Sequence, residues 1–301
     1  MRWRCFAGSS IGAYDPRGAM KIRTIAVLGA GTMGHGIAHA AIAGGYDTRM
    51  FDVSDAAVQK GVSSIEGILR KGVDLGKATA ADADAMRSRL TATTKIAEAL
   101  DGADFVIEAA PEKIDLKLAL MDDIDRLAPD HAIVATNTSA LSITEMAGAT
   151  KRPSRVAGMH FFNPVHRMKL IEIVQALESA PETLQTIEEV SRQMGKETVL
   201  VRESPGFITT RVNASIGNEA FYMLMEGVAS ARDIDKALKL GLNHPMGPFE
   251  LVDLVGLDTR LSILEYLHRT MGEKYRPCPL LAQYVKAGRL GRKVGRGVYE
   301  Y

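Results

Sequence analysis

The chain has 301 residues, of which 46% are hydrophobic and 24% charged, a composition ordinary for a globular protein of one large or two modest domains. With 37 basic and 36 acidic residues the formal net charge is +1. The chain therefore lacks the excess of positive charge that is typical of nucleic-acid-binding proteins, and we expect no nucleic-acid partner. Only Cys5 and Cys278 are present and the seven histidines lack metal-ligand spacing. We therefore expect no disulfide framework and no metal site, and a cytoplasmic location.

Residues 1–20 carry Arg2, Arg4 and Arg17 among small residues, without apolar periodicity. A transit peptide would be amphipathic and poor in acidic residues, and this segment fits that description poorly. We expect a mobile N-terminal extension without function, followed by the first strand.

The segment from Thr24 to Tyr46 runs for 23 residues without Asp, Glu, Lys or Arg, which is long enough for a membrane span. Its six glycines argue against a spanning helix, because each glycine in a helix interior costs about 1 kcal/mol relative to alanine. A β-branched run over 24–28 and an alanine-rich run over about 33–43 instead predict a strand, a tight turn and a helix. We therefore expect no membrane segment.

The turn between this strand and helix reads GAGTMG and matches the G-x-G-x-x-G pattern at the junction where it binds dinucleotides. The helix N-terminus supplies free N–H groups and a positive dipole end for the phosphates. The next strand ends in Asp52, 18 residues beyond the last glycine, where a carboxylate can accept hydrogen bonds from the adenosine ribose. The pattern predicts an NAD site formed by Gly29, Gly31, Thr32, Met33, Gly34 and Asp52.

The remaining N-terminal part alternates strands and helices. Polar helical runs over about 56–71 and 81–90 predict a helical hairpin inserted over about 55–90. The alternation predicts an α/β fold, a Rossmann-like, doubly wound and mostly parallel sheet, in a domain over residues 21–203. Further strands are expected over residues 105–109, 133–136, 156–162, 170–174 and 198–201, and helices over 116–127 and 182–194.

Beyond the segment ESPGF, the β-rich runs stop. Residues 204–301 are predicted to form a smaller, all-helical C-terminal domain. Such a domain often carries a dimer interface, and we expect a homodimer, although no heptad register proves it. The expected helices cover about 216–226, 231–240, 249–255 and 258–270.

The stretch HFFNPV is followed closely by MKLIEIV, and Asn163-Pro164 is a turn signal between these two extended runs. If they pair as a hairpin centred near residue 166, His160 and Glu172 lie opposite each other, with Cβ atoms roughly 5 Å apart. A carboxylate there would fix the imidazole tautomer and favour its protonated form, as a base removing a hydroxyl proton beside NAD requires. The alternative, a core histidine near a strand-edge charge, is equally compatible with the spacing.

Two polar segments, EAAPE over 108–112 and NTS over 137–139, each follow a predicted strand, where ligands bind in open α/β sheets. Ordinary loop and helix-capping residues would look the same.

Together these segments resemble the short 3-hydroxyacyl-CoA dehydrogenases, including the bacterial 3-hydroxybutyryl-CoA dehydrogenases. The resemblance covers about residues 20–301 and includes GAGTMG, EAAPE, NTS, HFFNPV, MKLIEIV, SPGF, NHPMGPFEL and LGRKVGRGVY. It implies NAD as cofactor, an acyl-CoA substrate, His160 as catalytic base with Glu172 as its partner, and Ser139 near the C3 oxygen and thioester. It further implies that the nicotinamide half of the site is lined by Glu112, Lys117, Asn163 and Lys293, and that the polar hairpin binds the CoA tail, with Arg70 and Lys71 as candidate phosphate contacts.

The chain departs from the family pattern after SPGF, where Thr210 precedes Arg211 in place of the usual Asn. Threonine can still form a hydrogen bond, but with a shorter reach and without an amide N–H. We keep Thr210 as a candidate substrate-orienting residue, and Asn213 could compensate if this region is helical.

The sequence therefore predicts an NAD-dependent oxidation of (S)-3-hydroxyacyl-CoA, most simply 3-hydroxybutyryl-CoA, to the 3-oxoacyl-CoA, or the reverse, in fatty-acid or other short-chain acyl-CoA metabolism. Two alternatives remain open. One is an NAD-dependent dehydrogenase of a free hydroxy acid or sugar acid, and the other is a non-catalytic NAD-binding protein on the same scaffold.

Overall fold

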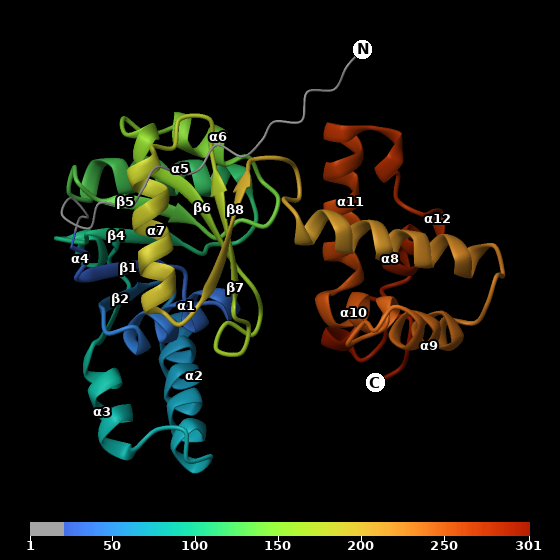
Figure 1. Cartoon of the computed structure of the whole chain (residues 1–301), viewed down its shortest axis with the longest axis horizontal. Coiled ribbons are helices and arrows are strands. Elements are labelled where there is room, and N and C mark those ends of the chain that lie inside the picture. The colour runs from blue at the N-terminus through green and yellow to red at the C-terminus, as the bar shows by residue number, and fades with distance from the viewer. Residues whose placement is uncertain (1–20) are drawn as a thin grey trace.

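The computed structural model describes residues 21–301, so the expected extension over residues 1–20 lies outside the described part of the chain. Eight strands in the described part form one sheet in the order β3-β2-β1-β4-β5-β6-β7-β8 (Figure 1). All neighbouring pairs are parallel except β6 and β7, which confirms the predicted Rossmann-like fold class. The strands are β1 (Thr24–Leu28), β2 (Asp47–Phe51), β3 (Leu90–Thr93), β4 (Phe105–Glu108), β5 (Ile133–Thr136), β6 (Val156–Phe161), β7 (Leu170–Gln175) and β8 (Glu197–Arg202).

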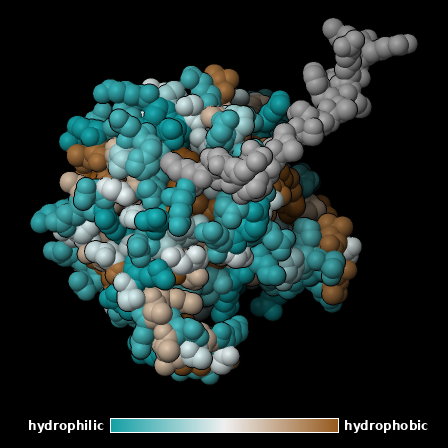
Figure 2. Space-filling model, turned by 60° about the vertical axis from the view of Figure 1, so that its left-hand side comes forward, coloured by the Kyte–Doolittle hydropathy of each residue, from teal (hydrophilic) through white to brown (hydrophobic). Residues whose placement is uncertain are grey.

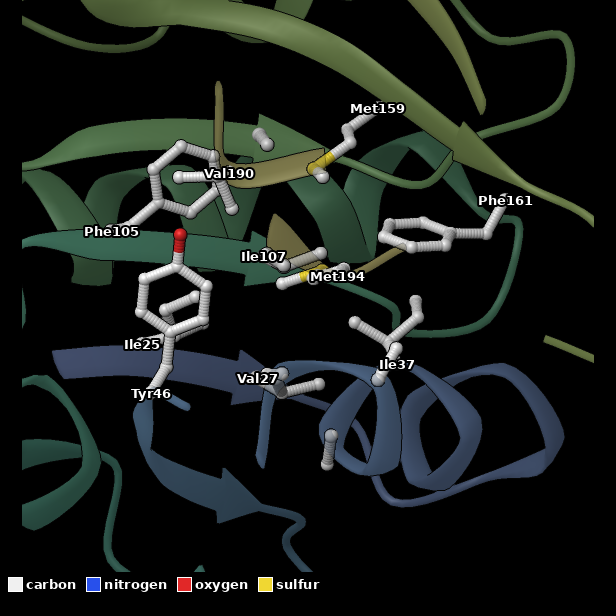
Figure 3. Packing of buried hydrophobic residues seen from close by; sticks show 14 of the residues in the cluster. Ile25, Val27, Ile37, Tyr46, Phe105, Ile107, Met159, Phe161, Val190 and Met194 are labelled. Carbon is white, nitrogen blue, oxygen red and sulfur yellow. The ribbon is translucent and has the colours of Figure 1, made fainter. Parts of the chain in front are cut away.

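Helices cover both faces of this sheet, and alternate strand residues enter two separate cores. Ile25 and Val27 of β1 pack toward α1 and α7, as Figure 3 shows together with side chains from β4 and β6. Ala26 and Leu28 of the same strand face the opposite core, which α4, α5 and α6 close. The helices of this part are α1 (Thr32–Ala43), α4 (Ile96–Leu100), α5 (Ile114–Leu127), α6 (Ile143–Gly148) and α7 (Pro181–Gln193), with a short 3-10 turn η1 (Pro153–Arg155).

The predicted helical hairpin is formed by α2 (Asp55–Asp74) and α3 (Ala80–Ser88), which extend away from the sheet in Figure 1. Arg87 of α3 and Glu66 of α2 form an ion pair at 2.8 Å between the two helices. The structure ends α3 at Ser88, and the following residues form the edge strand β3, which the sequence did not predict. This strand has only four residues, too few to show a clear alternation of hydrophobic and polar residues.

The C-terminal part is helical from α8 onward and has its own core, in which Phe221 and Phe249 pack edge to face with ring centroids 5.2 Å apart. Helix α8 begins at Thr209, seven residues before the predicted start, because its first turn is held by contacts to the sheet described below. Helix α12 was not predicted. The elements are α8 (Thr209–Met225), α9 (Ala231–Gly241), α10 (Pro248–Val255), α11 (Leu257–Met271), η2 (Glu273–Tyr275), α12 (Pro279–Lys286) and η3 (Arg292–Val294).

The surface of the molecule carries mostly hydrophilic side chains with scattered apolar ones on the face that Figure 2 shows. Among residues 21–301, no helix combines the length and the apolar character that crossing a bilayer requires.

Candidate active site

The glycine turn joins β1 to α1, and each of its three glycines meets a different steric demand. A Cβ on Gly29, where φ is +112°, would lie 2.6 Å from the carbonyl oxygen of Ala109, and one on Gly34 would lie 1.8 Å from the carbonyl oxygen of Gly29. These two positions therefore allow the tight turn and the close approach of helix and strand. A Cβ on Gly31, by contrast, would meet nothing within 4 Å. The open space beside Gly31 fits a bound pyrophosphate.

The start of α1 fits the same ligand. Gly31 caps the helix without a side-chain hydrogen bond, and the first turn contains no acidic residue. The N–H groups of Thr32, Met33 and Gly34 precede the first intrahelical bond, which runs from His35 to Gly31. Within residues 21–301 these three donors have no partner, and together with the positive end of the helix dipole they suit an anionic phosphate group.

Asp52 lies at the carboxyl end of β2, beside this turn. Its Oδ2 accepts a hydrogen bond from the backbone N–H of Ala30 at 2.9 Å, and its Oδ1 accepts one from Ser54 at 3.3 Å. These bonds orient the carboxylate at the edge where an adenosine ribose would lie. The residues present at this end of the sheet therefore fit an NAD molecule.

His160 and Glu172 face each other across the antiparallel pair of β6 and β7, in the register that the turn at Asn163-Pro164 predicts. The Nδ1 atom of His160 lies 2.7 Å from Oε2 of Glu172. The histidine side chain is 8% exposed and the glutamate is fully buried, so the pair is largely screened from water. The expected contact between these two side chains is present.

Glu172 contacts Thr209 as well as His160. The backbone N–H of Thr209, in the first turn of α8, donates to Oε1 at 2.9 Å, and the Thr209 hydroxyl donates to Oε2 at 3.2 Å. Burial by itself raises the pKa of Glu172, but the hydrogen bonds from His160 and Thr209 outweigh it and hold the pKa below its usual value. Glu172 is thus ionised at neutral pH.

Two aromatic rings enclose the imidazole of His160. Phe162 lies with its ring centroid 4.5 Å from that of the histidine, and Phe207 lies at 5.8 Å. Phe207 has a φ of +50°, a conformation that a bulky residue rarely adopts. This backbone strain lies beside the proposed catalytic base, where strained residues tend to gather.

Glu112 joins the loops that follow β4 and β5. Its Oε1 accepts hydrogen bonds from the Thr138 hydroxyl at 2.6 Å, the Ser139 N–H at 2.8 Å and the Ser139 hydroxyl at 3.1 Å. Lys117 lies 3.5 Å from the other carboxylate oxygen of Glu112 and is otherwise buried against Glu108. The structure therefore brings Glu112, Lys117 and Ser139 into one network at the carboxyl edge of the sheet.

The other predicted site residues are more dispersed. Lys293 pairs with Asp258 at 2.6 Å within the helical part, and among residues 21–301 no hydrogen bond or ion pair joins it to the sheet. Asn163 is exposed in the loop between β6 and β7, and Arg70 and Lys71 are exposed near the end of α2. Thr210 lies beside Thr209 in the first turn of α8, so the region is helical and Asn213 lies one turn further on. Direct roles for these residues remain predictions.

Sequence reasoning missed two residues that shape the site and named a third, Asn137, only as part of the NTS segment. Phe207 was interpreted only as part of the boundary segment ESPGF and Thr209 was given no role, although both contact the His160–Glu172 pair. Asn137 accepts a hydrogen bond from the N–H of Phe161 at 2.9 Å and so fixes the end of β6 against β5. The position of Asn137 after a strand was a signal for it, whereas nothing local marked Thr209.

A glycine turn, a ribose-orienting acid and a histidine–carboxylate pair thus line one edge of a doubly wound sheet, the place where such sheets bind ligands. These features define a dinucleotide-dependent dehydrogenase.

Comparison with known proteins supports this class of enzyme. Residues 24–204 match the family model of the 3-hydroxyacyl-CoA dehydrogenase NAD binding domain, and residues 206–301 match that of the C-terminal domain. The chain is 46% identical to a probable 3-hydroxybutyryl-CoA dehydrogenase of Bacillus subtilis, over 94% of this chain and 98% of that protein. It is 42% identical to a 3-hydroxybutyryl-CoA dehydrogenase of Bradyrhizobium diazoefficiens, over 94% and 97%. The crystal structure of (S)-3-hydroxybutyryl-CoA dehydrogenase PaaH1 from Ralstonia eutropha superposes with a TM-score of 0.90 at 45% identity, over 93% of this chain and 99% of that one.

The chain belongs to the 3-hydroxyacyl-CoA dehydrogenase family. It is an oxidoreductase that uses NAD, and the predicted family, enzyme class and cofactor are confirmed.

Proposed function

We propose that the protein interconverts short-chain (S)-3-hydroxyacyl-CoA, with 3-hydroxybutyryl-CoA as the simplest case, and the corresponding 3-oxoacyl-CoA. In the oxidative direction the C3 hydroxyl loses its proton to the protein and the C3 hydrogen leaves as hydride. NAD supplies the hydride acceptor when it is bound. The observation that carries the proposal is the His160–Glu172 pair, in which Nδ1 and Oε2 are 2.7 Å apart. Relatives that align with this chain over nearly their whole length are named 3-hydroxybutyryl-CoA dehydrogenases, one of them as probable.

The tautomer of His160 follows from its partner. An ionised carboxylate can only accept hydrogen bonds, so the Nδ1 atom facing Glu172 carries the hydrogen. The other ring nitrogen, Nε2, is then free to take the hydroxyl proton, and Glu172 stabilises the imidazolium that results. In the reductive direction the same atom returns the proton to the C3 oxygen.

The groups around this pair would position the substrate. Ser139 has its hydroxyl and N–H directed to Glu112, which fixes the loop where the C3 oxygen and the thioester would lie. Phe162 and Phe207 limit the access of water to the imidazole. The network at Glu112 and Lys117 would form the floor beneath the nicotinamide.

The experiment is a steady-state assay with NADH and either acetoacetyl-CoA or free acetoacetate, followed by the loss of NADH absorbance. We expect reduction of the CoA ester with a kcat/KM far above that of the free acid. Equal or better use of free acetoacetate would favour a dehydrogenase of free hydroxy acids, and no turnover of either compound would favour an inert scaffold.

We also propose a homodimer formed through the helical C-terminal part. Apolar side chains of α8 and α10 are exposed there, among them Val212 at 54% and Leu254 at 50%, and so is Leu242 at 64%, directly after α9. Light scattering after size-exclusion chromatography tests this: a particle of one chain's mass, 32.5 kDa, would contradict it. The cytoplasmic location stays a prediction.

A further inference from the structure

Thr209 contacts both oxygens of the Glu172 carboxylate. Its backbone N–H donates to Oε1 at 2.9 Å and its hydroxyl donates to Oε2 at 3.2 Å. Oε2 is also the atom that faces Nδ1 of His160 at 2.7 Å. An ionised carboxylate only accepts hydrogen bonds, so the Thr209 hydroxyl and the imidazole share one acceptor atom. The hydroxyl therefore acts on the same oxygen through which Glu172 acts on His160.

Glu172 also takes the place of a missing cap on α8. The residue before the helix, Ile208, makes no side-chain capping bond, and the first turn contains no acidic residue. The first α-helical hydrogen bond runs from Val212 to Ile208, so the N–H of Thr209 needs a partner from outside the helix. Glu172 of β7 supplies it. The positive end of the helix dipole adds to the stabilisation of this carboxylate.

The turn between β8 and α8 directs Thr209 toward the carboxylate (Figure 1). Gly206 and Phe207 both have positive φ, +74° and +50°, and the second value is rare for a bulky residue. The N–H of Phe207 donates to the carbonyl of Ser204 at 2.9 Å, and the N–H of Arg211 donates to that of Gly206 at 2.8 Å. Such strain persists where the surrounding structure fixes it. Here it brings the start of α8 against the histidine–glutamate pair.

Within residues 21–301, no third charged side chain forms an ion pair with His160 or Glu172. The residue beside Glu172 on β8 is Val199, and the rings against the imidazole belong to phenylalanines. The charged groups on the surrounding elements have other contacts: Glu203 after β8 accepts hydrogen bonds from Ser142 and Thr144, Glu112 accepts one from Ser139, Arg211 of α8 donates to Tyr275, and Glu145 of α6 is exposed.

The number of donors on Glu172 affects how firmly His160 holds a proton. Burial raises the pKa of Glu172, but the hydrogen bonds from His160 and Thr209 outweigh it and keep the pKa below its usual value. Each donor stabilises the negative charge of the carboxylate. A carboxylate with one donor fewer stabilises an adjacent imidazolium more strongly. Without the Thr209 hydroxyl, His160 should therefore keep its proton to higher pH.

We propose that Thr209 is a positioning residue of the dehydrogenase: it fixes the Glu172 carboxylate against His160 and, by sharing Oε2, makes the imidazolium a better proton donor. The inference rests on the proposed function and adds a residue to it. The proton passes from the C3 hydroxyl to Nε2 of His160 in oxidation and returns to the C3 oxygen in reduction. Thr209 takes no proton itself and acts only through Glu172.

The test is the pH profile of kcat/KM for wild-type and Thr209→Val enzymes. Valine keeps the branched shape and the backbone N–H but removes the hydroxyl. For oxidation of (S)-3-hydroxybutyryl-CoA, which needs the neutral imidazole, we expect the midpoint of the acid limb to rise by about 0.5 pH unit. For reduction of acetoacetyl-CoA, which needs the imidazolium, the midpoint of the alkaline limb should rise as well. Unchanged or lower midpoints overturn the inference, even where the rate falls.

Three further variants assign the effect. Thr209→Ser returns a hydroxyl and should restore the wild-type midpoints. In a Glu172→Gln background, Thr209→Val should add no shift, and an added shift overturns the inference that Thr209 acts through Glu172. Ser215→Ala removes a hydroxyl of the same helix that donates to the carbonyl of Arg211 at 3.0 Å. Its midpoints should stay as in wild type, and a shift equal to that of Thr209→Val overturns the inference.

An NMR titration of the imidazole signals gives a readout that needs no turnover. The His160 signal is identified by its loss in His160→Gln, and its midpoint should be higher in Thr209→Val than in wild type. If Thr209→Val does not fold, Thr209→Ala replaces it, because alanine has the higher helix propensity. Equal NMR midpoints contradict the role of Thr209. A wild-type enzyme that turns over neither ester contradicts the proposed function instead.

Discussion

Lys117 of α5 donates hydrogen bonds to both carboxylate oxygens of Glu108, at 2.7 and 2.8 Å, in a pair whose side chains are 1% and 0% exposed. Glu108 is the last residue of β4 and also accepts hydrogen bonds from the Thr136 hydroxyl and the Ala110 N–H. The pair thus fixes α5 to the sheet directly beneath the loop that carries Glu112.

Replacing Lys117 by Met should lower the free energy of unfolding by about 3 to 5 kcal/mol, because it leaves the Glu108 carboxylate buried without a cation. Urea denaturation measures the change. Lys113→Met, which removes an exposed lysine just before the same helix, is the control and should stay within about 0.5 kcal/mol of wild type. A loss below about 1 kcal/mol for Lys117→Met would show that the pair contributes little.

Asp52 should select NADH over NADPH. A 2′-phosphate would meet the Asp52 carboxylate, and the next residues are Val53 and Ser54, neither of which can neutralise it. The measurement is kcat/KM for the two cofactors with acetoacetyl-CoA. An enzyme that prefers NADPH would contradict the role of Asp52.

Thr210 and Ser139 should differ in how much they orient the substrate. Thr210→Val should reduce kcat/KM by only about 2 to 13-fold, since one hydrogen bond contributes about 0.5 to 1.5 kcal/mol. Ser139→Ala should cost more, because the loop that carries Ser139 is fixed to Glu112. Thr210→Asn should be tolerated. Steady-state kinetics with thermal melts tests all three variants, and loss of activity in a folded Thr210→Val enzyme beside a mild Ser139→Ala effect would reverse the order.

His39 on α1 should make the fold less stable in mild acid. Burial, followed by the nearby His166, Lys196 and His35, lowers the pKa of His39 to about 4. Its Nδ1 is enclosed without a partner. In the unfolded chain the pKa of this histidine is near 6.5, so the unfolded state binds the proton more readily. The stability that the neutral His39 contributes to the fold is therefore complete above about pH 6.5 and is lost as the pH falls toward 4.

Replacing His39 by Gln should therefore flatten the fall in the free energy of unfolding between pH 6.5 and 4, by up to about 3 kcal/mol at the acid end. Urea titrations at several pH values measure the slope. His244→Gln, at a histidine without a side-chain hydrogen bond in the described residues, should leave the slope as in wild type. An unchanged slope in His39→Gln would show that His39 does not govern it.

Much of this architecture follows from local sequence. The change from a β-branched run to an alanine-rich run located β1, the glycine turn and α1. The turn at Asn163-Pro164 gave the register that places His160 opposite Glu172, because in an antiparallel pair a fixed turn determines every cross-strand partner.

Other features depend on contacts between segments distant in sequence. The first turn of α8 is rich in β-branched residues with modest helix propensity, and its start is fixed by the bond from Thr209 to Glu172, 37 positions away. The sequence did not single out Arg260 of α11, which is buried and packs beside Gly217 of α8.

The central claim, that His160 is the catalytic base, is tested most directly by the steady-state reduction of acetoacetyl-CoA by wild-type and His160→Gln enzymes at saturating NADH. General acid–base catalysis contributes about 10² to 10⁴-fold, so kcat should fall by that factor. The Kd for NADH should stay near that of wild type, because the cofactor is held mainly at the glycine turn and Asp52. A folded His160→Gln enzyme with near-wild-type kcat would contradict the account and place the base elsewhere.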